Sequence, residues 1–318
     1  MEFPKYTKLP SELRRHVVSY NDYKTLPNYA ACSKLCNEEV QKTYIYFPEN
    51  IEIRDKMSTG VVVTLDYEEP RKMSCRMKFT TVDGNKHQMD FWNSSESYTY
   101  DGNAHQAAVE YIENRLKYAR IGKPTLLMID VKTWPTGLMD VHGIEKYGDW
   151  VIAIRESMYQ GFYESVVNHP IQNVRLTLLQ PYIGYTKRRR FIMPAQFFET
   201  DFFQNLATLD GDYALLEMSE DSFLALKARE IEMNISKLSV TAINQKISQW
   251  LANPPTTQIK YQFRDYNRGL KSLIDDILVN LPVKREEEGR YRFHLVHKTG
   301  VKATIEIVYD TIVFKTNS

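Results

Sequence analysis

From residue 104 onward the sequence alternates helical and extended segments about five times, and this alternation restricts the fold more than any other feature. Apolar residues three to five positions apart, such as Ala107, Ile112 and Leu116, predict an amphipathic helix, and the near-continuous apolar run 125–131 predicts a buried strand. Parallel strands need a crossover connection, so helices between short strands imply a parallel sheet with right-handed crossovers. The irregular spacing between strands excludes a strict solenoid of fixed period. The alternation of helices and short strands nevertheless predicts a curved, leucine-rich-repeat-like α/β sheet.

The alternation assigns a helix and a strand to each repeat of the pattern. The predicted helices are 104–119, 150–169, 197–206, 222–228 and 242–251, and the predicted strands are 125–131, 174–179, 213–216, 230–235 and 258–263.

Antiparallel strands are predicted on both sides of this region. Residues 45–92 alternate apolar and polar side chains, with a turn signal at Asp83-Gly84, and predict an antiparallel sheet. Near the C-terminus, the charged run 284–290 leads into strands predicted from residue 291 and at 301–309 and 311–315. The chain therefore ends in a predicted hairpin or meander.

The N-terminal segment predicts three short helices before residue 47. Pro10 suits the first turn of a helix, Ser11 can cap it, and Leu13, Val17 and Val18 share one face. Three helices in about 45 residues bury too little surface to fold alone. On spacing alone, the segment is either a docking module or a helical cap on a larger domain.

The order of residues in this segment resembles the F-box, the module by which substrate receptors dock onto the Skp adaptor of cullin-based ubiquitin ligases. The resemblance is carried by Leu9-Pro10, Glu12-Leu13, Val17-Val18-Ser19-Tyr20, Asp22-Tyr23, Thr25-Leu26 and Ser33-Lys34. The sequence departs from the family at Asn21, usually leucine, and at Cys36, often tryptophan. The adaptor-facing residues that the resemblance implies are Leu9, Pro10, Leu13, Val17, Val18, Leu26 and Ser33.

Three later segments resemble the F-box-associated domain of a family expanded in nematodes; they are 247–251, 259–263 and 293–305. Together the two resemblances imply an F-box over 1–47 and a substrate-recognition domain over 48–318. The expected fold is a three-helix F-box followed by a leucine-rich-repeat-like helix–strand domain with antiparallel strands at both ends.

The resemblance implies a non-catalytic receptor that recruits protein targets to a Skp–cullin–F-box ligase. Its expected partners are the Skp adaptor, through it a cullin, and a protein substrate, and it is expected in the cytoplasm or nucleus. The alternative is a protein-interaction scaffold outside any ligase.

Charge and cysteine content narrow the other possible partners. The 41 basic and 40 acidic side chains leave a formal net charge of +1, which gives no general attraction for nucleic acid or membrane surfaces. The three cysteines form neither a disulfide framework nor a paired C-x-x-C motif. We therefore expect reduced thiols, no membrane association, and neither cofactor nor metal.

The sequence contains no nucleophile elbow, phosphate-binding loop or zinc-protease helix motif. The histidines are dispersed, and the close pair His294 and His297 would point to opposite faces of a strand. An unrecognised enzyme remains a third alternative, with Asp130, Lys132 and His142 as its nearest candidates.

One dense basic run, Lys187, Arg188, Arg189 and Arg190, is predicted in a loop. Its interpretations are a solvated loop, a nuclear address, and contact with a negatively charged substrate segment, where arginine donates bidentate hydrogen bonds.

Overall fold

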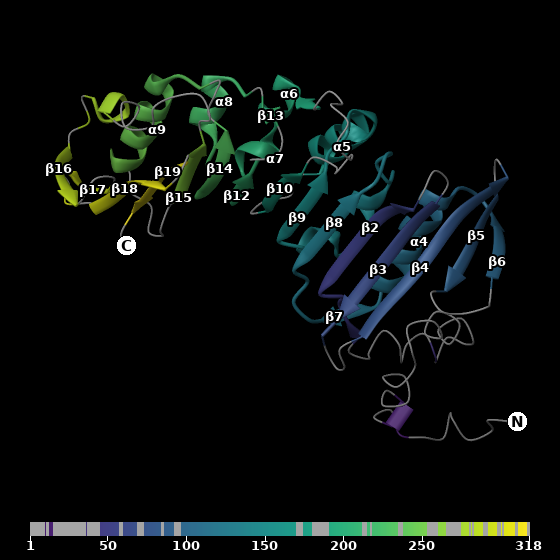
Figure 1. Cartoon of the computed structure of the whole chain (residues 1–318). Coiled ribbons are helices and arrows are strands. Elements are labelled where there is room, and N and C mark those ends of the chain that lie inside the picture. The colour runs from purple at the N-terminus through teal and green to yellow at the C-terminus, as the bar shows by residue number, and fades with distance from the viewer. Residues whose placement is uncertain are drawn as a thin grey trace, which may run out of the picture. The chain divides into compact units, whose positions relative to one another are not determined.

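The computed structural model divides the chain into two compact units. Unit 1 comprises residues 1–131 and 135–147, and unit 2 comprises residues 132–134 and 148–318. The structure describes residues 10, 13–14, 36, 45–56, 60–68, 73–83, 86–91, 97–169, 174–179, 191–211, 215–216, 218–234, 238–252, 260–264, 275–279, 281, 283–288, 292–297, 300, 302–308 and 311–316. Figure 1 labels their helices and strands.

Unit 1 is built on a mixed sheet with the strand order β8-β2-β3-β4-β5-β6. Strand β2 pairs antiparallel with β3 on one side and parallel with β8 on the other, and β3 to β6 continue as antiparallel neighbours. The strands are β2 (Asn50–Lys56), β3 (Gly60–Tyr67), β4 (Met73–Asp83), β5 (Lys86–Phe91), β6 (Ser97–Asp101) and β8 (Leu126–Asp130).

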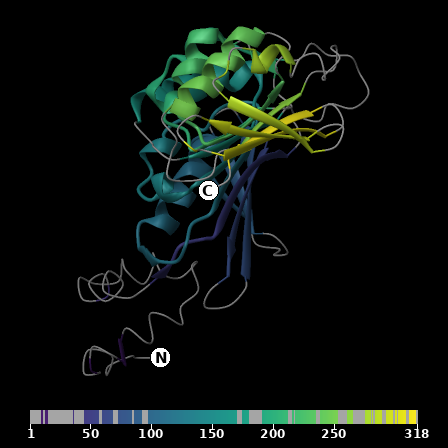
Figure 2. The same cartoon turned by 90° about the vertical axis from the view of Figure 1, so that its left-hand side faces the viewer.

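Helix α4 (Ala104–Leu116) covers one face of this sheet. The Asn103 side chain caps the helix by accepting a hydrogen bond from the Gln106 amide at 2.8 Å. Buried residues at a spacing of four form the inner stripe: Ala104, Ala108, Ile112 and Leu116. The helix contacts β3, β4 and β5, and Figures 1 and 2 show it on one side of the strands.

Phe47 anchors the chain just before the sheet of unit 1 begins. It follows β1 (Ile45–Tyr46), which pairs parallel with β7 (Ala119–Ile121), and its amide donates to the Ile121 carbonyl at 2.6 Å. Its ring packs against Gly143, where an added Cβ would lie 2.9 Å from Phe47 Cε1. Gly143 precedes the short helix η3 (Ile144–Lys146), which follows η2 (Leu138–Asp140). Phe47 is therefore packed against the turn region 138–147.

Unit 2 is built on a sheet with the order β16-β17-β18-β19-β15-β14-β12-β10-β9. Strands β9, β10, β12, β14 and β15 are parallel and adjacent in chain order, whereas β15 to β16 pair antiparallel through β19, β18 and β17. The strands are β9 (Asp149–Ala153), β10 (Arg175–Leu179), β12 (Thr208–Asp210), β14 (Glu230–Asn234), β15 (Lys260–Arg264), β16 (Val283–Glu288), β17 (Arg292–His297), β18 (Lys302–Val308) and β19 (Thr311–Thr316).

Helices connect the consecutive parallel strands of unit 2, as a parallel sheet requires. They are α5 (Glu156–Asn168), α6 (Ala195–Phe198), α7 (Asp201–Gln204), α8 (Glu220–Ala225) and α9 (Val240–Ala252). A separate pair of two-residue strands, β11 (Ile192–Met193) and β13 (Leu215–Leu216), lies outside the main sheet.

Aromatic side chains fill the core between the first helices of unit 2 and its sheet. The Phe162 ring of α5 lies 5.1 Å from Trp134 and 5.5 Å from Phe197, measured between ring centroids. Gly161 makes room for this packing, because an added Cβ would lie 2.9 Å from Trp134 Cβ. The other buried rings of this group are Trp150, Phe198, Phe202 and Phe203. Aromatic burial of this extent is a major source of stability.

Several predicted elements are confirmed and others are wrong. The antiparallel sheet predicted over 45–92 is confirmed from β2 to β5. Residues 149–153 form strand β9 rather than the start of a helix, because their apolar residues alternate between two faces of the sheet. Within the strand predicted at 213–216, Leu215–Leu216 form β13, which lies outside the main sheet; the strand that joins the main sheet in this stretch is 208–210. The charged run at 284–290 mostly forms strand β16.

The predicted fold class, a three-helix F-box followed by a leucine-rich-repeat-like domain with antiparallel strands at both ends, is wrong. The described residues form a mixed α/β structure in which unit 2 has a nine-stranded sheet of parallel and antiparallel strands. The helices that connect its parallel strands range in length from 13 residues to four. A solenoid requires a repeating unit of nearly constant length, and these connections do not provide one. Most of the predicted helical triplet lies outside the described residues.

Candidate functional site

Four parallel strands of unit 2 bury one face and expose the other. Their inward residues, Trp150, Leu176, Leu209 and Ile231, are at most 1% exposed. The residues on the opposite side are half-buried or exposed and mostly polar: Asp149, Val151, Arg175, Thr177, Thr208, Asp210, Glu230 and Glu232. Because successive side chains of a strand point to opposite faces, this second set shares one face of the sheet.

The antiparallel strands show the same division. Phe293, Leu295, Ala303, Ile305 and Phe314 are buried. Most residues that alternate with them are half-buried or exposed, namely Arg292, His294, Lys302, Thr304, Glu306 and Lys315, whereas Val313, opposite Glu306, is buried. These alternating buried and accessible positions are the pattern of a sheet whose one face is solvated.

The helices of unit 2 account for this asymmetry. Figures 1 and 2 show α8 and α9 on one side of the strands, and the buried Trp250 ring of α9 packs on the inward-facing Phe314 at a centroid distance of 4.8 Å. We call the opposite side, carrying the polar residues named above, the open face of unit 2. An accessible, mostly polar sheet face can bind a macromolecular partner, and it is our candidate functional site.

At the β9 end of the open face, charged side chains pair across neighbouring strands. Arg175 Nε lies 3.7 Å from Asp149 Oδ1, and Arg175 Nη2 lies 3.4 Å from Glu230 Oε2. The strand register explains the contacts, since Arg175 is directly opposite Asp149 and also opposite Thr208, which in turn is opposite Glu230. Each side chain is at least 39% exposed, so the pairs add little to stability but order the surface.

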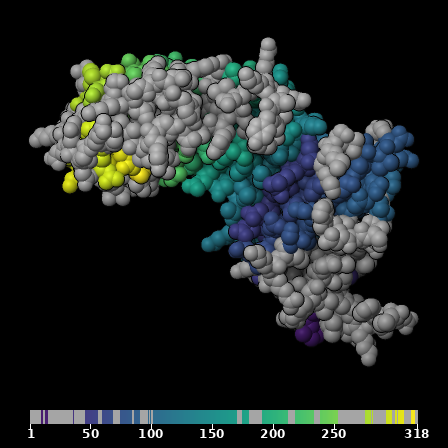
Figure 3. Space-filling model, viewed as in Figure 1, coloured from purple at the N-terminus to yellow at the C-terminus, as the bar shows by residue number. Residues whose placement is uncertain are grey.

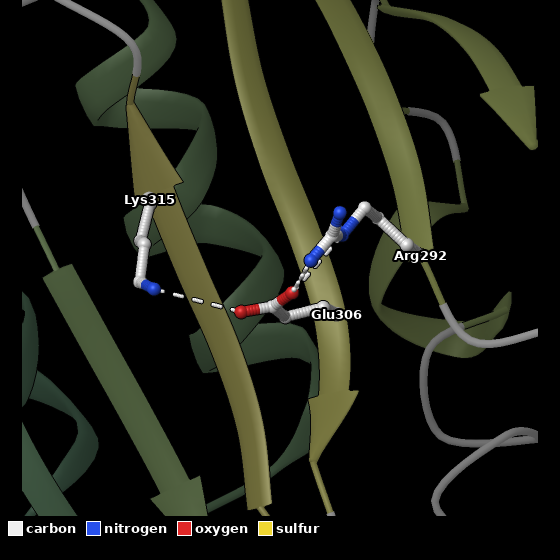
Figure 4. Close-up of polar contacts among 3 residues, drawn as sticks. All are labelled: Arg292, Glu306 and Lys315. Carbon is white, nitrogen blue, oxygen red and sulfur yellow. Dashed lines mark hydrogen bonds and ion pairs between the residues drawn. The ribbon is translucent and has the colours of Figure 1, made fainter. Parts of the chain in front are cut away.

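At the other end, Glu306 holds two basic side chains, as Figure 4 shows. Arg292 donates to Glu306 Oε2 from Nε at 3.1 Å and from Nη2 at 3.0 Å. Lys315 Nζ donates to Glu306 Oε1 at 3.5 Å. Glu306 therefore uses both carboxylate oxygens, and its side chain is only 17% exposed. Charge-assisted bonds of this kind fix long side chains in one geometry.

Unit 1 also has a polar face on the side of its sheet away from α4. Arg54 pairs with Glu52, and Lys78 Nζ lies 3.6 Å from Asp90 Oδ2. Burial opposes ionisation of Asp90, but hydrogen bonds from Gln88 and Ser97 and the nearby Lys78 ammonium together outweigh it and lower the pKa of the carboxyl group. Figure 3 shows atoms of β2 and β3, coloured purple-blue, at the surface turned toward the viewer.

Only two of the residues predicted to face the adaptor are described. Pro10 is exposed, and the Leu13 residue is 50% exposed. The Arg14 amide donates to the Pro10 carbonyl at 3.0 Å, which is one helical hydrogen bond. Leu9, Val17, Val18, Leu26 and Ser33 lie outside the described residues, as do Lys187, Arg188, Arg189 and Arg190.

The three candidates for an enzymatic site differ in their exposure to solvent. Asp130 is half-buried at the end of β8, while Lys132 and His142 are exposed. Within the part of the chain that the structure describes, no group of three or more His, Cys, Asp or Glu residues could hold a metal ion. Among those same residues, no helix combines the length and hydrophobicity needed to cross a membrane.

Lys246 is a buried charged group that the sequence analysis did not single out. It is 6% exposed, and its amine donates to the carbonyls of Leu224, at 2.8 Å, and Leu226. These carbonyls belong to the C-terminal end of α8, where backbone acceptors lack helical partners. Burial lowers the pKa of Lys246 to about 8. The contacts give it the role of a helix cap, not of a ligand-binding group.

The open face was also missed by the sequence analysis, although its signal is present. Runs such as 230–232 and 292–295 alternate charged and apolar residues with a period of two. That alternation predicts that one face of each strand is solvated. It does not predict which strands are neighbours in the sheet, so it cannot predict which charged side chains lie close together.

No model of a known protein family matches this sequence, and no curated protein matches it at a significant level.

Proposed function

We propose that this protein is a substrate receptor of a Skp–cullin–F-box ubiquitin ligase. The observation that carries the proposal is the residue order over 8–37, where Leu9-Pro10, Val17-Val18 and Thr25-Leu26 occur in the order and spacing of the F-box family. The exposure of Pro10 and Leu13 supports it, because docking residues must be accessible before the partner binds.

In this proposal the N-terminal segment binds the Skp adaptor and, through it, a cullin. The open face of unit 2 supports a role in target recognition, since a broad polar surface on a rigid sheet is suited to binding a protein. The receptor makes and breaks no bonds. It raises the effective concentration of target lysines near the ubiquitin-conjugating enzyme, and it acts in the cytoplasm or nucleus.

Co-purification with the adaptor tests the docking half. The full chain is co-expressed with a Skp adaptor and isolated through a tag on the adaptor. Replacing Leu9→Ala together with Pro10→Ala should abolish recovery of the chain. As a control, Val82→Ala with Val167→Ala truncates two apolar side chains that are 56% and 50% exposed elsewhere, and it should leave recovery unchanged.

Failure of the wild-type chain to bind any Skp adaptor would refute the ligase proposal. The accessible sheet face would then favour the alternative, a protein-interaction scaffold outside any ligase. Capture of the same target proteins by the chain with residues 1–44 deleted would distinguish that function, provided that circular dichroism shows the remaining chain to be folded.

A further inference from the structure

Strand β6 is the last strand at one end of the unit 1 sheet, as Figure 1 shows. It pairs antiparallel with β5 along its whole length, from Ser97 opposite Asp90 to Asp101 opposite Lys86, without a shift in register. Among the strands that the structure describes, none pairs with its other edge. Such an edge carries a row of backbone N–H and C=O groups with which a further strand can pair. We call it the β6 edge.

The β6 edge lacks the features that prevent pairing with another chain. Proteins protect edge strands with lysine, proline, bulges or inward-pointing charges. The sequence of β6, Ser-Tyr-Thr-Tyr-Asp, contains neither lysine nor proline, and its only charged residue, Asp101, is the last. In unit 2, by contrast, the terminal strand β16 has a charged residue at every position after Val283. Of these two terminal strands, β6 is therefore the better suited to strand addition.

One face of β6 is accessible to solvent. Ser97, Thr99 and Asp101 are exposed, and they share a face because they alternate along the strand. The register places Thr99 opposite the half-buried Gln88 and Asp101 opposite the exposed Lys86. Substitutions at the three exposed positions can therefore probe the edge without altering the buried side of the sheet.

The sequence of β6 is compatible with antiparallel pairing to a second copy of itself. A two-fold axis at the middle residue, Thr99, brings all five positions of both strands into the pairing. Thr99 then lies opposite the same residue of the second copy, and Ser97 lies opposite the second copy's Asp101. Threonine pairs on neighbouring strands are favourable, and in this register no charged residue lies opposite a like charge.

Charge favours this arrangement over a parallel one. In the antiparallel pairing the two Asp101 residues are separated by four positions along the strand direction, which is roughly 14 Å. That separation exceeds the Debye length of about 8 Å at physiological ionic strength, so their repulsion is largely screened. Parallel pairing in register would instead place Asp101 directly opposite the same residue of the second copy, which is unfavourable.

We propose that two copies of this protein associate by pairing their β6 edges antiparallel. The occupant of the edge is a second copy because the pairing uses the full length of the strand and brings no like charges together. The surface is separate from the proposed function, since it makes no use of the F-box-like segment. Five residues from each copy form a small interface, so the dimer should be weak and depend on concentration.

Sedimentation velocity with the full chain measures the association. Wild type should shift from monomer to dimer as its concentration rises from about 1 to about 200 µM. Thr99→Lys places two ammonium groups opposite each other across the axis and should weaken association about fivefold. The matched control is Ser74→Lys at an exposed position of β4, which changes the net charge equally and should stay within about twofold of wild type.

Cysteine cross-linking tests the register of the pairing. In Thr99→Cys the two new thiols face each other with Cβ atoms roughly 5 Å apart, close to the separation that a disulfide requires. Oxidation with copper phenanthroline should therefore link this variant into a covalent dimer. Asp101→Cys should remain monomeric on a non-reducing gel, because its new thiols are roughly 14 Å apart. Wild type controls for the three native cysteines and should not cross-link.

Three results would each overturn the proposal. Wild type that remains monomeric over the whole concentration range would show that β6 does not pair with itself and would leave its edge to a strand of another protein. Equal weakening by Thr99→Lys and Ser74→Lys would place any dimer contact elsewhere. Cross-linking of Asp101→Cys as efficient as that of Thr99→Cys would exclude the pairing centred on Thr99.

Discussion

The burial of Lys246 predicts that the protein becomes more stable as the pH rises above 8. The ordinary pKa of this amine is 10.5, and burial lowers it to about 8 in the folded chain. Between these two values the unfolded chain holds more protons than the folded one. Raising the pH through this range therefore favours the folded state, whereas below pH 8 both states are protonated and the contribution is constant.

The size of the effect follows from the shift in pKa. One pKa unit corresponds to about 1.4 kcal/mol, so the whole shift amounts to about 3 kcal/mol, of which about 2.5 kcal/mol should be reached by pH 10. Lys246 is only 6% exposed, so solvent screening reduces this figure little.

Urea denaturation of the full chain at pH 7, 8, 9 and 10 measures the effect, with tryptophan fluorescence as the signal. Other lysines and the tyrosines also titrate in this range, so the informative quantity is the difference between wild type and Lys246→Met. Methionine keeps the length of the side chain and removes the charge. We expect the free energy of unfolding of wild type to gain about 2.5 kcal/mol on that of the variant between pH 7 and pH 10.

A difference that stays constant from pH 7 to pH 10 would refute the reasoning. It would mean that the amine titrates alike in the folded and unfolded chains. At pH 7 the Lys246→Met substitution changes the free energy of unfolding in two opposite ways. Loss of two hydrogen bonds to the end of α8 lowers it, and removal of a buried charge raises it.

Two further predictions concern the packing of residues 47–48 against the turn region 138–147. Gly143→Ala should lower the free energy of unfolding by about 1–3 kcal/mol, because φ is +98° and the new methyl group would lie 2.9 Å from Phe47 Cε1. In the control Gly148→Ala, where an added Cβ meets nothing within 4 Å, the free energy of unfolding should change by less than about 0.5 kcal/mol. Similar losses in the two variants would count against the packing argument. Tyr147→Phe should cost about 1–2 kcal/mol in the same denaturation assay, because the buried hydroxyl donates to the Pro48 carbonyl at 2.8 Å, and an unchanged denaturation midpoint would show that this hydrogen bond adds no net stability.

The N-terminal motif shows which part of the proposed function could be predicted from the sequence. The order of Leu9-Pro10 and the residues after it supplies the ligase hypothesis, and nothing in the described structure would have supplied it. In contrast, the cluster of Arg292, Glu306 and Lys315 is visible only in the structure. Arg292, Glu306 and Lys315 are up to 23 positions apart in sequence, and only the pairing of β17 with β18 and of β18 with β19 brings them together.

Local periodicity determined most of the elements, since the period of a helix or a strand is a property of a short segment. Helices α4 and α9 are close to their predicted ranges for this reason, and strands β2 to β5 lie within the antiparallel sheet predicted over 45–92. Where a segment was both short and apolar, as at 149–153, periodicity could not separate a strand from a helix.

By itself the sequence determined the apolar and polar sides of most strands and the F-box-like order of residues that motivates the proposed function. Only the tertiary structure decided that the parallel strands of unit 2 continue into an antiparallel meander and that Glu306 joins Arg292 to Lys315. The physical reason is that strand pairing depends on backbone hydrogen bonds, which every residue except proline can form in full, so the choice of neighbour is made by packing across the whole domain.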